Sequence, residues 1–203
     1  MSHSAQLRMC DAFVSHSWHD DAPAKWTALQ RWRASFVEVH GREPSVWIDK
    51  FCIDQNNIEV DLRCLPVFLS GCRRLVVFCG PTYLNRLWCI IELFTYIQMG
   101  CAVDRIDFQI VQREGHMDDV ASIIRAFDDF DAKQCDCFSV EDKERMLNII
   151  HTAFGDLASF SSAVRTIFNE AGWRTRCCST MNGTSSLTDS EFINGSSCGS
   201  DSD

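Results

Sequence analysis

The chain has 203 residues, of which 46% are hydrophobic, and it carries a formal net charge of −9. This length suits one folded domain with an appendage, and six Trp and fourteen Phe supply a sizeable core. The negative charge argues against nucleic acid or an anionic membrane surface as the main partner.

Short apolar runs alternate with segments of helical period between residues 10 and 168, a pattern typical of a parallel sheet with helices on both faces. The strands are expected at residues 11–15, 45–49, 74–79, 105–111 and 134–138. The helices are expected at residues 23–39, 58–70, 117–127 and 139–168, with one more that follows Asn85 as its N-cap. Pro66 is expected to bend the second helix, and Ser139 to open the last one with a capping box.

Composition divides the chain into three parts. Residues 1–9 form an amino-terminal extension, residues 10–170 the α/β domain, and residues 171–203 a tail rich in Ser, Gly and Asp. The tail has too little apolar surface to fold, so it is expected to be disordered.

No feature of the sequence predicts secretion or membrane insertion. Residues 1–8 lack the apolar core of a signal peptide, and the longest apolar stretch is shorter than the ~20 residues of a membrane span. Most of the twelve Cys are scattered through apolar segments without a C-x-x-C pair, where free Cys acts as a small hydrophobe. We therefore expect a cytoplasmic protein.

Glu92 is the only charged residue between Arg86 and Asp104, and the helix expected around it is apolar on nearly every face. A carboxylate in such surroundings loses hydration, which raises its pKa and marks a candidate functional site. At ~1.5 Å per residue, Glu92 lies about 10 Å along the helix from Asn85, near the carboxyl ends of the strands. The alternative is a glutamate whose carboxyl group reaches solvent or pairs with Arg86.

Other chemistries have less support. The group His16, His19, Asp20 and Asp21 falls on a strand-to-helix loop, where such residues more often cap helices than bind metal, so no metal site is expected. The third strand lacks the phosphorylatable Asp of a receiver domain, and no Gly-rich phosphate loop is present. Cys89 has no His at a recognisable place, so it is expected to be a buried structural residue.

The segment from Ser70 to Leu93 resembles a sequence block of Toll/interleukin-1-receptor (TIR) domains. That block has a Ser, an apolar strand, a Tyr, and then Trp-Cys-x-x-Glu-Leu, whose Glu is Glu92 here. Residues 11–16 resemble the family's opening strand, and Asp49 has the usual position after the second strand. Residues 46–55 also resemble the signature of fungal heterokaryon-incompatibility domains, and the Arg-Gly loop of TIR domains is absent there.

The resemblance implies a flavodoxin-like three-layer α/β/α fold, with five parallel strands in the order 2-1-3-4-5. It implies cleavage of NAD⁺ at the nicotinamide–ribose bond by a self-associated protein, with NAD⁺ as substrate, no separate cofactor, and Glu92 as catalytic carboxylate. The residues expected to bind the substrate are Ser15, His16, Ser17, Trp18, Asp49 and Trp88. Many TIR domains are instead non-catalytic interaction modules of innate-immune or cell-death-type signalling, and that alternative stays open.

Overall fold

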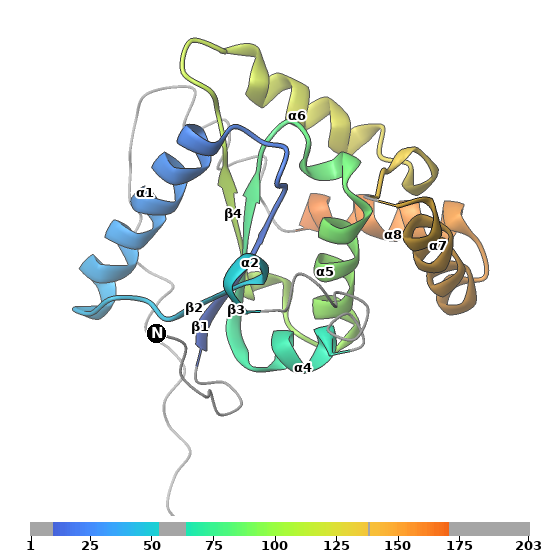
Figure 1. Ribbon diagram of the computed structural model, residues 1–203, viewed down its shortest axis with the longest axis horizontal. Coiled ribbons are helices and arrows are strands. Elements are labelled where there is room, and N and C mark those ends of the chain that lie inside the picture. Colours follow the sequence, from blue (N-terminus) through green and yellow to red (C-terminus); the bar gives the residue numbers. More distant parts are fainter. Residues whose placement is uncertain (1–9, 53–63, 138, 171–203) are drawn as a thin grey trace, which may run out of the picture.

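The computed structural model describes residues 10–52, 64–137 and 139–170, which form an α/β fold around a four-stranded parallel sheet (Figure 1). The strands are β1 (Cys10–His16), β2 (Val46–Ile48), β3 (Cys72–Cys79) and β4 (Ile106–Ile110), in the order β2-β1-β3-β4. All three strand pairs are parallel. The fold class predicted from the alternation of strands and helices is confirmed, as is the order of these four strands.

The predicted fifth strand is wrong. Residues 132–134 form a 3-10 turn, η3 (Ala132–Gln134), and Asp136 makes only an isolated parallel bridge with Arg86. The Asp136 amide donates to the Asn85 carbonyl at 2.6 Å, and the Asp136 carbonyl accepts from the Leu87 amide at 3.1 Å. These two bonds tie the segment to the start of α5 (Leu87–Gln98), which precedes it in the chain, instead of to the free edge of β4.

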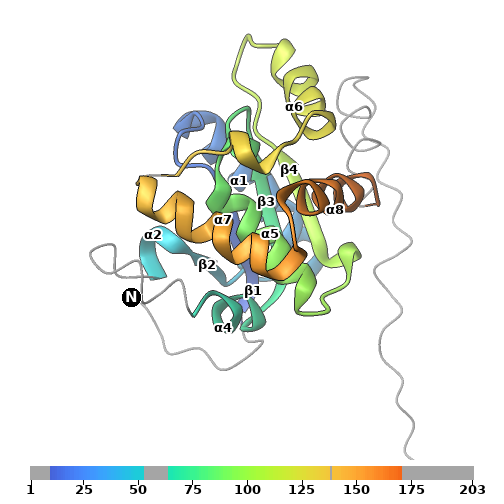
Figure 2. The same cartoon turned by 90° about the vertical axis from the view of Figure 1, so that its right-hand side faces the viewer.

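The helices and 3-10 turns connect the strands and cover both faces of the sheet (Figures 1 and 2). They are α1 (Ala22–His40), α2 (Asp49–Cys52), α4 (Leu65–Ser70), η1 (Tyr83–Asn85), α5 (Leu87–Gln98), η2 (Val103–Arg105), α6 (Asp118–Asp128), α7 (Val140–Phe154) and α8 (Leu157–Glu170). Figure 2 shows α5, α7 and α8 in front of the sheet, with α1 behind it.

Local sequence accounts for several helix boundaries. The Ser139 hydroxyl caps α7 by accepting from the Asp142 amide at 3.0 Å, as predicted, and Gly155, with a positive φ of 80°, ends that helix. Pro66 lies in the first turn of α4, where its missing N–H costs no helical bond. The predicted N-cap at Asn85 is wrong, because Asn85 lies within η1 and Arg86 precedes α5 without a side-chain cap.

The alternation of side chains along β1 decides which residues face α5. Ala12 and Val14 pack with Ala28 and Trp32 of α1 in one cluster, whereas Phe13 belongs to the larger cluster on the other face. Because side chains alternate along a strand, Ser15 follows Phe13 to the α5 side. This register places a polar group at the carboxyl end of β1 beside an apolar helix.

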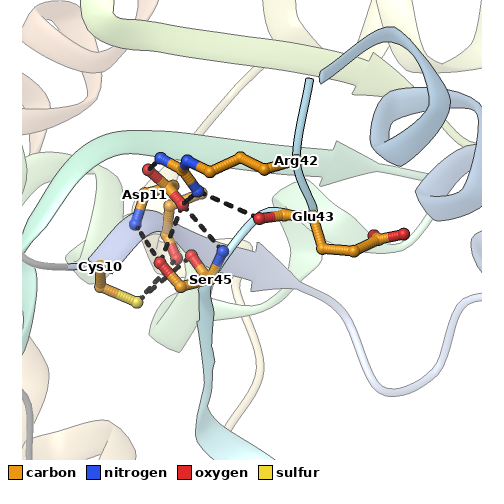
Figure 3. A network of polar contacts seen from close by, with 6 residues as sticks. Cys10, Asp11, Arg42, Glu43 and Ser45 are labelled. Carbon is orange, nitrogen blue, oxygen red and sulfur yellow. Dashed lines mark hydrogen bonds and ion pairs between the residues drawn. The ribbon is translucent and has the colours of Figure 1, made fainter. Parts of the chain in front are cut away.

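A second polar cluster joins the amino end of β1 to the segment before β2, at the opposite end of the sheet (Figure 3). The Asp11 carboxylate, only 5% exposed, accepts two bonds of 2.7 Å from the Arg42 guanidinium and two of 2.8 Å from the amide and hydroxyl of Ser45. The Arg42 hydrogen bonds hold the pKa of Asp11 well below its usual range.

We expect Asp11→Asn to lower the free energy of unfolding by about 1–3 kcal/mol at pH 7, since it removes a charge-assisted bidentate pair. Because the folded protein lowers the pKa of Asp11, the wild-type advantage is present above the ordinary carboxyl pKa near 4 and is lost as the pH falls below it. Urea denaturation at pH 7 and pH 3 measures both effects, with the exposed Asp104→Asn as control. Equal loss of stability in both variants would contradict the prediction.

The predicted extension at residues 1–9, tail at residues 171–203 and part of the predicted loop and helix at residues 53–63 lie outside the described residues. Within the part of the chain that the structure describes, no helix combines the length and apolarity needed to cross a membrane.

Candidate functional site

The carboxyl group of Glu92 lies at the carboxyl end of β1, and the sequence predicted Glu92 near the carboxyl ends of the strands. The Ser15 hydroxyl donates to Glu92 Oε2 at 2.6 Å. Ser15 Oγ also lies 2.8 Å from the hydroxyl of Tyr83, which is completely buried. The Ser15 hydroxyl at the end of β1 thus links Glu92 of α5 to Tyr83 of η1.

Glu92 is partly buried, and the loss of hydration at its carboxyl group governs its electrostatics. Loss of hydration raises the pKa of its carboxyl group to about 8, an effect that the Ser15 hydrogen bond partly opposes and the negative charge of Asp49 reinforces. Among the described residues, no Lys or Arg forms an ion pair with Glu92. A carboxyl group with this pKa is largely protonated at neutral pH, and it is poised to change its charge when a ligand arrives.

Trp18 and Asp49 join the loops after β1 and β2. The Trp18 indole N–H donates to Asp49 Oδ2 at 2.8 Å, and the Lys50 ammonium lies 6.0 Å from the centroid of the same indole. Trp18 is 51% exposed, so much of its surface is accessible to a ligand. Asp49, at the start of α2, is also close enough to Glu92 to raise its pKa.

The structure does not bring every predicted substrate-binding residue to Glu92. His16 follows Val14 to the α1 side of the sheet, and burial there lowers its pKa. The hydroxyl of Ser17 is buried and lies 2.7 Å from that of Thr82. Trp88 lies one turn before Glu92 on the same face of α5, half-buried against the core. Their predicted roles in substrate binding stay predictions.

Sequence analysis missed the residues that support this edge of the sheet. Tyr83 is the tyrosine of the TIR-like block, but only its contact with Ser15 identifies it as part of the site. Asp20, which is 5% exposed, accepts from the amide and hydroxyl of Thr82 at 2.9 and 2.8 Å. The Lys25 ammonium donates to the Ser17 carbonyl at 2.6 Å. The two bonds to Thr82 tie the loop after β1 to the turn after β3, and the Lys25 bond ties the same loop to α1.

Gly80 allows Asp20 to reach that turn. A Cβ atom at Gly80 would lie 2.4 Å from Asp20 Cγ, closer than any real contact. We expect Gly80→Ala to displace the carboxylate, break its bonds to Thr82 and lower the free energy of unfolding by about 1–3 kcal/mol. Chemical denaturation measures this loss. The same substitution in an Asp20→Ala background should cost clearly less, and full additivity of the two substitutions would contradict the explanation.

A separate hollow of about 270 Å³ lies at the carboxyl end of β4, between α1 and α6. It is lined in part by Arg31, Gln112 and Arg113. Neither Glu92 nor Ser15 lines it, so this hollow is distinct from the site at the ends of β1 and β3.

The site can therefore present a desolvated carboxyl group beside an exposed indole and a second carboxylate. Neither the protein-family models nor the curated proteins compared with this chain match it. The resemblance to TIR domains therefore depends on the residues named in the sequence analysis, and the function it implies is a proposal.

Proposed function

We propose that this chain is a TIR-like signalling domain that cleaves NAD⁺ at the nicotinamide–ribose bond when it self-associates. The observation that carries the proposal is the contact between Glu92 and Ser15 at 2.6 Å. This contact puts a desolvated carboxyl group at the carboxyl end of a parallel sheet, where such folds bind ligands. The resemblance to TIR domains assigns the catalytic carboxylate to the same residue.

The chemistry requires little beyond such a carboxylate. The bond between the nicotinamide nitrogen and ribose C1′ breaks, its electron pair neutralises the pyridinium ring, and positive charge develops on the ribose. An ionised Glu92 would stabilise that charge in a site of low polarity. Water then attacks C1′, so that NAD⁺ and water give ADP-ribose, nicotinamide and a proton. Trp18 offers a surface on which a flat ring stacks.

The direct test is to incubate the purified protein with NAD⁺ and to quantify nicotinamide by chromatography over a range of protein concentrations. We expect release per molecule to rise with concentration, because the proposed active form is assembled. Absence of release from concentrated, demonstrably assembled protein would refute the catalytic proposal.

The pH profile of this activity follows from the raised pKa of Glu92. We expect kcat/KM to rise with pH and to level off above about pH 8, since the ionised carboxylate is the active form. A general-acid role for Glu92 would give the opposite slope. Measurement between pH 6 and pH 9.5 on assembled protein distinguishes the two.

A non-catalytic interaction module is the second candidate. Large apolar side chains are exposed on α1, α2 and α4, among them Trp26, Phe51 and Val67. Exposed apolar groups favour association with another protein surface. Assembly that is unchanged by loss of the Glu92 charge, combined with absence of nicotinamide release by the wild type, would support this candidate.

A further inference from the structure

Three hydrogen-bonding contacts run in line from Glu92 into the core. Glu92 Oε2 lies 2.6 Å from Ser15 Oγ, Ser15 Oγ lies 2.8 Å from the Tyr83 hydroxyl, and that hydroxyl lies 3.3 Å from the Cys89 carbonyl oxygen. A hydroxyl donates one hydrogen, and a carbonyl donates none. The number of hydrogens available therefore decides how many of the three contacts are hydrogen bonds at one time.

An ionised Glu92 leaves one of these contacts without a hydrogen. Ser15 donates to the carboxylate and Tyr83 donates to Ser15, so nothing remains for the Cys89 carbonyl. A protonated Glu92 supplies the third hydrogen. Glu92 then donates to Ser15, Ser15 to Tyr83, and Tyr83 to the Cys89 carbonyl, which satisfies the whole chain.

The charged and titratable groups around Glu92 favour the neutral form. Asp49, at the start of α2, is a like charge, and burial keeps the hydroxyl of Tyr83 and the thiol of Cys89 protonated by raising the pKa of each. Cys79, at the end of β3, is the other thiol near Tyr83. Helix α4, which packs against α5, contains no charged residue.

We propose that Glu92 is protonated in the absence of a ligand, that its proton completes a hydrogen-bonded chain through Ser15 and Tyr83 to the Cys89 carbonyl, and that a ligand with a fixed positive charge binds there with release of the proton. The exchange balances, because the neutral carboxyl group and a cation give a carboxylate–cation pair and one proton. Asp49 adds negative charge on the same side.

This inference specifies the charge of the ligand. That the ligand is NAD⁺ rests on the proposed function. The nicotinamide ring of NAD⁺ carries a fixed positive charge, and the reduced ring of NADH has nearly the same shape without it. A site that works in this way distinguishes the two forms by charge. It also converts Glu92 into the anion that the proposed cleavage needs only when the cationic substrate is present.

The ligand test uses the carbocyclic analogue of NAD⁺, in which a methylene group replaces the ribose ring oxygen so that the ligand is not cleaved, together with its reduced form. Calorimetry in buffers of different ionisation enthalpy counts the protons released. At pH 7 we expect release of close to one proton per cationic ligand by the wild type and none by Glu92→Gln. Between pH 7 and pH 8 the affinity for the cation should rise by about fivefold, while that for the reduced form stays level.

Three results would overturn this inference: equal pH dependence for both ligand forms, no proton release by the wild type, or no binding of the cation at pH 9. None of these depends on catalysis, since the analogue stays intact. If assembled wild type releases no nicotinamide from NAD⁺ but shows the expected proton release with the analogue, the catalytic proposal fails and this inference stands.

The hydrogen-bonded chain has its own test, in which NMR of ¹³C-glutamate-labelled protein follows the titration of Glu92, assigned with Glu92→Gln. Tyr83→Phe removes two bonds from the neutral chain and one from the ionised chain, so it should lower the pKa of Glu92. Ser15→Ala removes the charge-assisted bond to the carboxylate and should raise that pKa. A general loosening of the structure would move both variants in one direction. An unchanged titration in Tyr83→Phe would overturn the role of the chain.

Discussion

Replacement of Glu92 by glutamine should lower nicotinamide release from NAD⁺ by at least about 10²–10³-fold, the scale expected when one electrostatic contact to a transition state is lost. The amide has nearly the same size and still accepts a hydrogen bond from Ser15, but it cannot carry the negative charge that stabilises positive charge on the ribose. The assay is chromatographic quantification of nicotinamide with concentrated, assembled protein.

The matched control is Glu38→Gln, which makes the same chemical change at an exposed position near the end of α1. It should leave nicotinamide release within about twofold of the wild type, because surface substitutions away from a site have small effects. If Glu92→Gln retained the activity of this control, Glu92 would not be the catalytic carboxylate, and any activity observed would have to come from another residue.

Glu92→Gln should also make the protein more stable than the wild type, by an amount that increases with pH. Folding raises the pKa of Glu92 from 4.5 to about 8, so the folded state is free of this electrostatic cost below pH 4.5 and acquires it progressively up to about pH 8. The wild type therefore loses stability across that range, and Glu92→Gln does not. We expect the variant to match the wild type near pH 4.5 and to exceed it by about 2–4 kcal/mol at pH 8.5.

Urea denaturation at pH 4.5, 6.5 and 8.5 measures this difference, with Glu38→Gln again as the control that should follow the wild type at each pH. A variant that is equally or less stable at pH 8.5 would show that the carboxylate of Glu92 is well solvated or paired in the folded protein. A stability gain combined with a loss of activity is expected of a residue kept at a cost to the fold for the sake of function.

Hydrophobic periodicity in the sequence was sufficient to predict most of the architecture. The apolar run of β3 and the helical period of α1 and α6 are local properties, and these three elements lie within a few residues of their predicted positions. The same local information placed Glu92 in an apolar helix after the third strand. A desolvated carboxyl group follows from those neighbours alone, whatever the rest of the fold.

Contacts between distant segments decided the parts of the fold that local sequence patterns did not predict. The segment around Asp136 has strand-like residues, but its hydrogen bonds with Asn85 and Leu87 draw it to the start of α5, and no local pattern reveals that competition. Likewise, the strand period shows that Ser15 and His16 face opposite sides of the sheet, but not which side α5 covers.

The partners of Glu92 are also a property of the tertiary structure. Ser15 and Tyr83 lie 77 and 9 positions before Glu92 in the chain. Ser15 bonds to the carboxyl group and Tyr83 bonds to Ser15, an arrangement that exists only because β1 and β3 are neighbours in the sheet. The sequence therefore determined that a carboxyl group would be carried into apolar surroundings. The packing of strand, turn and helix determined which hydroxyl groups reach it, because a hydrogen bond depends on distances of a few ångströms that only the folded chain defines.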